Sequence, residues 1–447
     1  MGVYSKEDII RIVREEEIEF VRLQFTDIFG MLKNVAITAS QIEKAVSNQC
    51  MFDGSSIEGF VRIDESDQYL YPDLKSFRVF PWRPSHGKVA RLICDVYNTD
   101  RNPFVGDPRY VLKRVIQKAN DMGYDRFNVG PEAEFFLFKT DEEGKPTTQT
   151  NDEAGYFDLG PLDHGESTRR EICMALEQMD FEIEASHHEC AQGQHEIDFK
   201  YAEALHAADN IMTFKLAVKT LAQRNGLHAT FMPKPIFGIA GSGMHTNMSL
   251  FRNGKKRLLR PRRSPRPVQR GVQLHRRTAP PCAGHGGGDQ PPGQLLQAAG
   301  ARLRGPLLPG LGRPSNRPPA PIRIPASRGQ GTRVELRSPD PVLQPLPGLR
   351  LSAWPPAWTA SSGASPLPLR SPATSMRWTT ASPGRQRHPG PALLPGGGLR
   401  EMEADPVIMD VLGGHVASHY IHGKMKEWNE YCIRVSNWEL EKYLVTY

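Results

Sequence analysis

The chain has 447 residues, of which 39% are apolar and 24% charged, and its formal net charge at pH 7 is +6. No stretch of about 18 apolar residues occurs in it, so we expect no transmembrane helix and no membrane partner. The segment from Met1 to Glu15 is charged and lacks the apolar core of a signal peptide. Six cysteines without a CxxC pair favour reduced thiols, and together these features predict a cytoplasmic protein.

The positive charge is concentrated in residues 251–400. This window holds 25 of the 56 Lys and Arg residues and 27 of the 38 prolines, but only 3 of the 50 acidic residues. Everywhere else in the chain, 31 basic residues stand against 47 acidic ones. One interpretation is a basic, disordered insert that binds nucleic acid. The other is a GC-rich gene translated out of frame, which yields Arg, Pro, Gly and Ala but very little Lys.

We favour the out-of-frame interpretation, because 23 of those 25 basic residues are Arg and aromatic residues are almost absent before Trp354. Residues 255–320 and 342–400 show neither a helical nor a strand period, and their composition cannot form a packed core. We therefore expect these two stretches not to be native sequence, and we expect no direct contact with nucleic acid.

The first 250 residues combine helical and strand patterns, which predicts the α+β fold class. In chain order, the patterns predict a helix that begins at the capping box Ser5–Asp8, a strand at 18–25, a helix at 40–46 and a strand at 89–97. The pairs Asn102-Pro103 and Asp107-Pro108 mark a boundary between two domains. We expect a small domain at residues 1–105 and a larger one at residues 106–447.

The larger domain repeats the mixture of helices and strands. Helices are expected at 110–122, 167–179 and 202–224, and beyond residue 401. Strands are expected at 127–138, 181–187, 195–199, 228–232 and 244–251, and within the island 321–340.

Acidic residues and one histidine recur on the expected strands of this domain. Glu132 and Glu134 are two positions apart in a strand, so their side chains point to the same face. Each acidic residue taken alone fits an ordinary solvated face. Beside the apolar run Phe135–Phe138, however, a buried carboxylate without a partner would be costly. The acidic residues and the histidine together form a set of ligands that suits Mg²⁺ or Mn²⁺ better than zinc: Glu132, Glu134, Glu189, Glu196, Glu335 and His245.

Several longer motifs around these residues resemble type I glutamine synthetases, the bacterial dodecameric enzymes, in their shorter Gram-positive form. The stretches that carry the resemblance are Met51–Phe60, Asn128–Phe136, Ala185–Glu189, Gly193–Glu196, Gly241–His245 and Ile322–Arg337. The resemblance covers residues 1–253, 321–341 and about 401–447. It implies a small N-terminal β-grasp domain and a catalytic domain built from an antiparallel sheet and helices.

The resemblance also implies two or more Mg²⁺ or Mn²⁺ ions in each site, with ATP as co-substrate. One ion would be held by Glu134, Glu189 and Glu196, and the other by Glu132, His245 and Glu335. The sites would lie between neighbouring subunits of a homododecamer made of two stacked hexameric rings. Nitrogen-regulating transcription repressors are further partners that the resemblance suggests.

Substrate-handling roles follow from the same resemblance. Asp53 and Ser56 would reach into the neighbouring subunit's site, where Asp53 holds ammonium and removes its proton. Arg323 and Arg337 would handle phosphate and the γ-glutamyl phosphate. The remaining roles are a glutamate contact at Gly241, nucleotide contacts at Asn247 and Ser249, and feedback inhibition by glutamine at Arg62.

The implied activity is ATP-dependent synthesis of glutamine from glutamate and ammonium through a γ-glutamyl phosphate. A γ-glutamyl polyamine ligase is an alternative on the same fold, but the motif at Asp53–Ser56 favours ammonium. A second alternative is a catalytically impaired regulatory protein. It is favoured by the absence of the family's substrate-binding Arg and flap Glu motif, where this sequence has Gln297–Pro306 instead.

Overall fold

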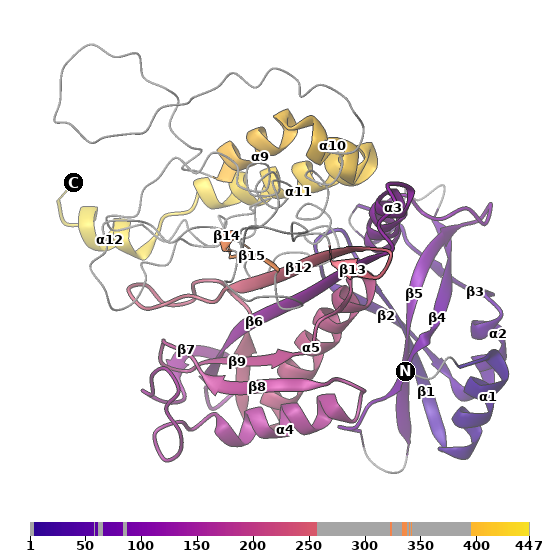
Figure 1. The fold of residues 1–447 in the computed structure, drawn as a ribbon. Helices are drawn as coiled ribbons and strands as arrows, with labels where there is room; N and C mark the ends of the chain where they lie inside the picture. Colours follow the sequence, from indigo (N-terminus) through magenta and orange to yellow (C-terminus); the bar gives the residue numbers. More distant parts are fainter. Residues whose placement is uncertain are drawn as a thin grey trace, which may run out of the picture.

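The computed structural model confirms the α+β class and contains two sheets (Figure 1). It describes residues 4–57, 59, 60, 66–83, 87–256, 322, 323, 333–337, 339, 341 and 395–446. The stretches in which we expect non-native sequence therefore lie almost wholly outside the described residues. None of the described helices offers an apolar stretch of the length that a bilayer requires.

The N-terminal sheet has five strands in the order β2-β1-β5-β4-β3. Their bounds are β1 Ile18–Thr26, β2 Leu32–Thr38, β3 Cys50–Asp53, β4 Asp67–Val79 and β5 Lys88–Asn98. The central strands β1 and β5 run parallel, and the other neighbours are antiparallel. The helices α1 (Lys6–Glu15) and α2 (Ile42–Val46) contribute buried residues to its core, and the short 3-10 helix η1 is Ala39–Gln41. The predicted Ser5 capping box is present.

Three strands of this sheet, β2, β3 and β4, were not expected from the sequence. In β4 the segment around Asp73 carries Pro72 and several charges, and its pairing with β5 shifts register between Asp73 and Arg78. An irregular strand of this kind lacks the clean alternation by which a strand is recognised.

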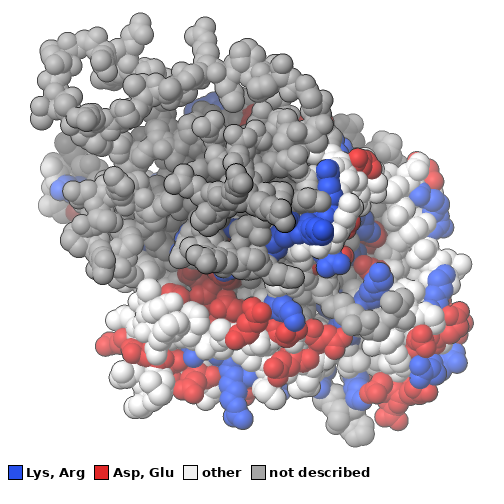
Figure 2. Space-filling view, in the orientation of Figure 1, with Lys and Arg blue, Asp and Glu red and all other residues white. Residues whose placement is uncertain are grey.

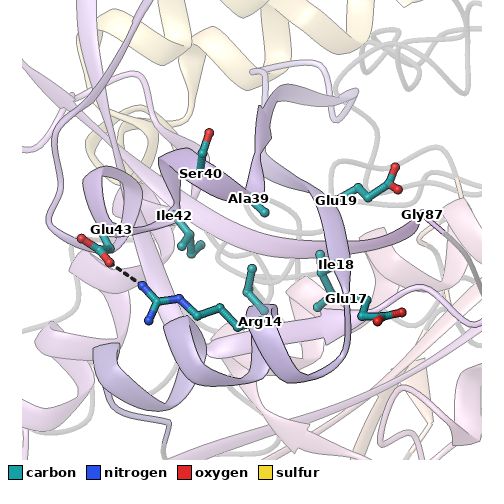
Figure 3. Close-up of a pocket in the computed structure, with 10 residues that line it drawn as sticks. Arg14, Glu17, Ile18, Glu19, Ala39, Ser40, Ile42, Glu43 and Gly87 are labelled. Carbon is teal, nitrogen blue, oxygen red and sulfur yellow. Dashed lines mark hydrogen bonds and ion pairs between the residues drawn. The ribbon is translucent and has the colours of Figure 1, made fainter.

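A cavity of about 490 Å³ opens in the N-terminal domain beside α1 and α2 (Figure 3). Acidic side chains line much of it, and Arg14 donates to Glu43 at 2.9 Å on one side. None of the residues predicted to bind substrate or metal lines this cavity. The chemistry predicted from the sequence therefore has to be sought in the second sheet.

The second sheet has ten described strands along the path β14-β15-β12-β6-β9-β8, with β7, β10 and β11 on β6 and β13 on β12. All described pairings within it are antiparallel. The strand bounds are β6 Arg126–Thr140, β7 Pro146–Thr150, β8 Ile183–His188, β9 Gln194–Phe199, β10 Ala202–Glu203, β11 Leu227–Thr230, β12 Met244–Arg252, β13 Lys255–Lys256, β14 Ile322–Arg323 and β15 Val334–Leu336.

The helices α4 (Glu166–Glu177) and α5 (Ala204–Arg224) cover one face of this sheet (Figure 1). On β6 the side chains that join their core are Ala133, Phe135 and Leu137, each two positions from the next. The residues between them must point to the opposite face, because successive side chains in a strand alternate. Glu132 and Glu134 are therefore placed on the face away from the helices.

Further helices pack above the sheet and against the N-terminal part of the chain. Their bounds are α3 Pro108–Asp121, α9 Pro395–Ala404, α10 Pro406–Leu412, α11 Gly414–Cys432 and α12 Asn437–Tyr443. Ile28, from the turn after β1, packs with Val111 of α3 and Val416 of α11 in one apolar cluster. This cluster joins the first and last described segments of the chain.

A buried ion network ties the two sheets together. The guanidinium of Arg109 on α3, which is 1% exposed, contacts Asp73 of β4 at 3.0 Å, Asp95 of β5 at 3.1 Å and Asp209 of α5 at 3.0 Å. A buried cation is tolerated only when such partners surround it. Since these partners come from both domains, Arg109 holds the N-terminal sheet against the helix that supports the second sheet.

The described residues on one face of the molecule do not share the basic character of the whole chain (Figure 2). Acidic side chains gather on the face shown in Figure 2, over the region where α4, β8 and β9 lie in Figure 1. The net charge of +6 therefore says little about the surface around the second sheet.

Candidate active site

The register of the second sheet brings the predicted metal ligands onto one face. Glu134 of β6 is paired with Glu196 of β9, and Glu132 of β6 with His245 of β12. On the other side of β12, Glu335 of β15 is paired with Asn247. Directly opposed residues on neighbouring strands lie on the same face and close together. Four strands that are far apart in the sequence thus supply one polar surface.

The first cluster on this surface consists of Glu132, His245 and Glu335, whose candidate ligand atoms all lie within 4.8 Å of one another. His245 Nδ1 is 3.6 Å from Glu132 Oε2. Asn247 Nδ2 donates to Glu132 Oε1 at 2.6 Å, and Asn247 Oδ1 accepts from Arg333 Nε at 2.6 Å. The structure therefore brings together the three residues predicted to hold one ion.

The second cluster consists of His187, Glu189 and Glu196, again with candidate ligand atoms within 4.8 Å of one another. His187 Nε2 is 3.6 Å from Glu196 Oε2. Glu134, the third residue predicted for this ion, lies beside them on β6. Its Oε2 atom accepts hydrogen bonds from Gln194 Nε2 at 2.7 Å and from the backbone N–H of Gly243 at 3.0 Å.

The crowding of acids shifts their pKa values strongly. Burial, the charge of Asp198 and that of Glu134 raise the pKa of Glu196 to about 11. Burial and the charge of Glu189 raise the pKa of Glu134 to about 8, and burial with the charge of Glu132 raises the pKa of Asp198 to about 7. Like charges in a desolvated site disfavour ionisation. A divalent cation would remove this penalty, so the donor set fits Mg²⁺ or Mn²⁺.

Glu132 behaves differently from these three acids. Its burial opposes ionisation, but its hydrogen bonds with His245 and Asn247 outweigh that effect and lower its pKa. Glu132 is therefore ionised at neutral pH, whereas Glu134 and Glu196 hold protons that a metal ion would have to displace.

The predicted substrate residues lie around the two clusters. The carbonyl of Gly241 accepts from Gln194 Nε2 at 3.0 Å, and a Cβ at this position would lie only 2.4 Å from the carbonyl oxygen of Pro233. Arg337 donates to Glu335, and the backbone of Arg323 pairs with Glu335 across β14 and β15. Ser249 is buried further along β12, on the same face as His245 and Asn247.

Asp53 and Ser56 do not join these clusters within the chain. Both are exposed, and Asp53 lies on β3, the edge strand of the N-terminal sheet, far from β6, β9 and β12 (Figure 1). Asp53 accepts a hydrogen bond from the backbone N–H of Ser55 at 2.8 Å, and its hydrogen bonds with Ser55 lower its pKa. Arg62 lies outside the described residues.

Sequence reasoning missed several residues of this surface. Asp198 lies two positions after Glu196 on β9, so the period of two could have identified it. His187 lies within the motif that contains Glu189, but it was not assigned a role; the ring of Phe157 now packs edge-on against it at 4.8 Å. The role of Gln194 became visible only when the sheet register was known, because its partners Glu134 and Gly241 are remote in the sequence.

Comparisons with known proteins agree with this arrangement. The model for the catalytic domain of glutamine synthetases matches residues 105–266 and 391–443, and the model for their β-grasp domain matches residues 17–99. Glutamine synthetase from Clostridium saccharobutylicum is 49% identical over 100% of both chains. The chain belongs to the glutamine synthetase family. The enzyme from Staphylococcus aureus strain Mu50 is 46% identical over 99% of both chains.

Solved structures share the fold of this chain. A complex of GmaS with ADP superposes with a TM-score of 0.73 at 25% identity, covering 98% of this chain and 99% of that one. The glutamine synthetase of Plasmodium falciparum superposes with a TM-score of 0.77 at 20% identity, covering 99% of both chains. The resemblance to type I glutamine synthetases is thus confirmed, and so is the expected pair of domain types.

We predict that Glu196→Gln stabilises the protein when metal is absent. In the unfolded chain this carboxyl ionises near its ordinary value of 4.5, whereas its pKa in the folded protein is about 11. Its ionisation therefore favours the unfolded chain, and stability is lost as the pH rises above about 4.5. At pH 7.5 in EDTA, the variant should unfold with a free energy at least about 1 kcal/mol higher than the parent.

Denaturant titrations at pH 5 and pH 7.5 measure this difference, which should be larger at pH 7.5. The matched control is Glu182→Gln, since Glu182 is exposed and pairs with Lys200 at the surface. A Glu196→Gln protein that is less stable than the parent in EDTA would contradict the electrostatic account of this cluster.

Proposed function

We propose that the polar face of β6, β9, β12 and β15 is the catalytic surface, and that its carboxylates hold two divalent cations. Membership of the glutamine synthetase family makes the chain an ATP-dependent glutamate–ammonia ligase. The observation that supports the location is the sheet register, which opposes Glu134 to Glu196 and Glu132 to His245.

In this proposal one ion binds Glu132, His245 and Glu335, and the other binds Glu134, Glu189 and Glu196 with His187 at its side. Oxygen-rich sets with a single imidazole suit Mg²⁺ or Mn²⁺. When bound, the ions supply positive charge for the phosphates of ATP and the carboxylate of glutamate. The hydrogen bonds that Glu134 accepts from Gln194 and Gly243 orient this carboxylate before any ion arrives.

The chain's own side chains supply the rest of the proposed chemistry. A carboxylate is a poor acyl donor, so the side chain of glutamate is first phosphorylated by ATP and ammonia then displaces the phosphate. Arg323 and Arg337 neutralise the transferring phosphoryl group, and Gly241 contacts glutamate. Asn247 and Ser249 adjoin the nucleotide, and Asn247 also steadies Glu132 through the hydrogen bond at 2.6 Å.

We propose that Asp53 and Ser56 act in the site of a neighbouring subunit. Ammonium must lose a proton before it can attack, because only ammonia has a lone pair. Asp53 is exposed and its lowered pKa keeps it ionised, which suits the binding of a small cation. The separation of its strand, β3, from β6, β9 and β12 supports a role across a subunit boundary (Figure 1).

Exposed apolar side chains support assembly into the proposed dodecamer. At the C-terminal end, Ile433 is 83% exposed and Leu444 73% exposed, and in the loop before α4, Leu159 is 72% exposed. Such side chains favour burial against another protein surface. Sedimentation of the purified protein tests this proposal, and a monomer at micromolar concentration would refute it. Feedback inhibition at Arg62, nitrogen-regulating repressors as partners, and a cytoplasmic location stay predictions.

We further propose that residues 255–320 and 342–400 are written out of frame and are absent from the natural enzyme. The catalytic-domain model supports this for the part between residues 266 and 391, because its match stops at the first and resumes at the second. An intact-mass measurement of the protein made from its natural gene tests the proposal. A mass equal to that of the written sequence, 50.0 kDa, would refute it and would favour the impaired regulatory protein.

The activity itself is tested by phosphate release from ATP with glutamate plus ammonium, and with glutamate plus putrescine. We expect release with ammonium only. We expect Glu132→Ala and Glu189→Ala to lower kcat/KM by at least about a hundredfold. Replacing residues that only support metal ligands already lowers metal affinity or activity by about 10- to 100-fold. Glu142→Ala, in the exposed turn after β6, is the matched control and should be fully active.

Release with putrescine but not ammonium would refute the choice of substrate. Full activity of either glutamate variant would refute the proposed metal ligands.

A further inference from the structure

The hairpin between β8 and β9 carries Glu189 and Glu196 on the catalytic surface, and a separate polar group lies behind it. The residues paired with each other at the end of this hairpin are His188 and His195, and both are 0% exposed. Their rings contact each other edge-on, with centroids 4.8 Å apart. No predicted role accounts for these two buried imidazoles.

His188 holds the backbone of Glu189. Its Nδ1 atom lies 2.7 Å from the carbonyl oxygen of Glu189, and its Nε2 atom lies 3.0 Å from Asp152 Oδ1. Both partners can only accept a hydrogen bond, so both ring nitrogens donate. The N–H of Glu189 in turn donates to the carbonyl of Gln194 at 2.7 Å. Both backbone polar groups of Glu189 are therefore fixed.

Asp152 connects the two sides of the turn. The same Oδ1 atom that accepts from His188 also accepts from the backbone N–H of Gly193 at 2.9 Å. Gly193 has a φ of +64°, and a Cβ there would lie 2.9 Å from the carbonyl oxygen of Leu137. The chain therefore needs glycine at this position, and one buried carboxylate anchors the hairpin before and after its turn.

The surrounding charges show that this group is not another cation site. Arg169 Nη1 lies 2.9 Å from His195 Nδ1, and Arg169 Nη2 contacts Asp163 at 2.7 Å. The guanidinium of Arg169 thus lies between His195 and Asp163. A metal ion placed among Asp152, His188 and His195 would meet this positive group at close range.

We propose that Asp152 and His188 are positioning residues that hold Glu189 in the geometry needed to bind a divalent cation. They touch neither substrate nor the proposed ions, and they act through the backbone of the hairpin. This inference rests on the metal sites proposed above. Partners behind a metal ligand commonly determine its orientation and the affinity of the site.

The test is a titration of the full-length protein with Mn²⁺. The electron paramagnetic resonance signal of the free ion measures how much Mn²⁺ is bound. Asp152→Asn keeps the size of the side chain but removes its charge. We expect this change to weaken Mn²⁺ binding by about tenfold to a hundredfold. Asp141→Asn is the matched control, because Asp141 also accepts two backbone N–H bonds, in the exposed turn after β6, and should leave binding unchanged.

Two substitutions of His188 separate positioning from a general loss of stability. An asparagine amide replaces the donor at Nδ1, which serves Glu189, whereas a glutamine amide replaces the donor at Nε2, which serves Asp152. We expect His188→Asn to bind Mn²⁺ more tightly than His188→Gln, even where both variants melt at the same temperature. The double variant Asp152→Asn/His188→Gln should lose no more Mn²⁺ affinity than the weaker-binding single variant, because the two residues act as a unit.

The inference would be overturned if Asp152→Asn and His188→Gln bound Mn²⁺ as tightly as the parent protein does. It would also be overturned if His188→Asn and His188→Gln had equal affinities for Mn²⁺. Failure of the parent protein to bind Mn²⁺ would instead refute the proposed metal sites, so the two failures are distinguishable.

Discussion

Repulsion among buried carboxylates is the constraint on which the arrangement of this protein depends. Glu134, Glu189 and Glu196 lie close together on one face of a sheet, and burial adds to the cost of ionising Glu134 and Glu196. Without a counter-ion such a cluster destabilises the fold at neutral pH. A structure that retains it needs strands that cannot spread apart and a cation that neutralises it.

The fold supplies that stiffness from the other face of the sheet. The apolar residues of β6 alternate with its glutamates and pack against α4 and α5. Arg109 then ties α5 to the N-terminal sheet through Asp73, Asp95 and Asp209. The hairpin that carries Glu189 and Glu196 is held in addition by the buried hydrogen bonds of Asp152 and His188.

Much of this could be predicted from the sequence, because strand periodicity and long motifs carry the information. The spacing of Glu132 and Glu134 places both on one face without reference to any relative, and most helices and strands of the second domain lie close to their predicted bounds. The pairing of the strands could not be predicted from residue spacing or from the motifs. Nothing in the spacing shows that Gln194 meets Glu134, or that Asp152 lies behind Glu189, because those contacts depend on register between distant segments. Asp53 lies on β3 of the N-terminal sheet and not on the sheet that carries the clusters, so its proposed role in a neighbouring subunit rests on the resemblance and not on residue spacing.

The central claim is that the crowded carboxylates exist to bind two divalent cations for glutamine synthesis. Equilibrium dialysis of the purified enzyme against Mn²⁺ at pH 7.5 counts the bound ions directly. The account predicts at least two ions per chain, with one lost in Glu335→Ala, from the first cluster, and one lost in Glu189→Ala, from the second. A stoichiometry below two in the parent protein, or an unchanged stoichiometry in both variants, would contradict it.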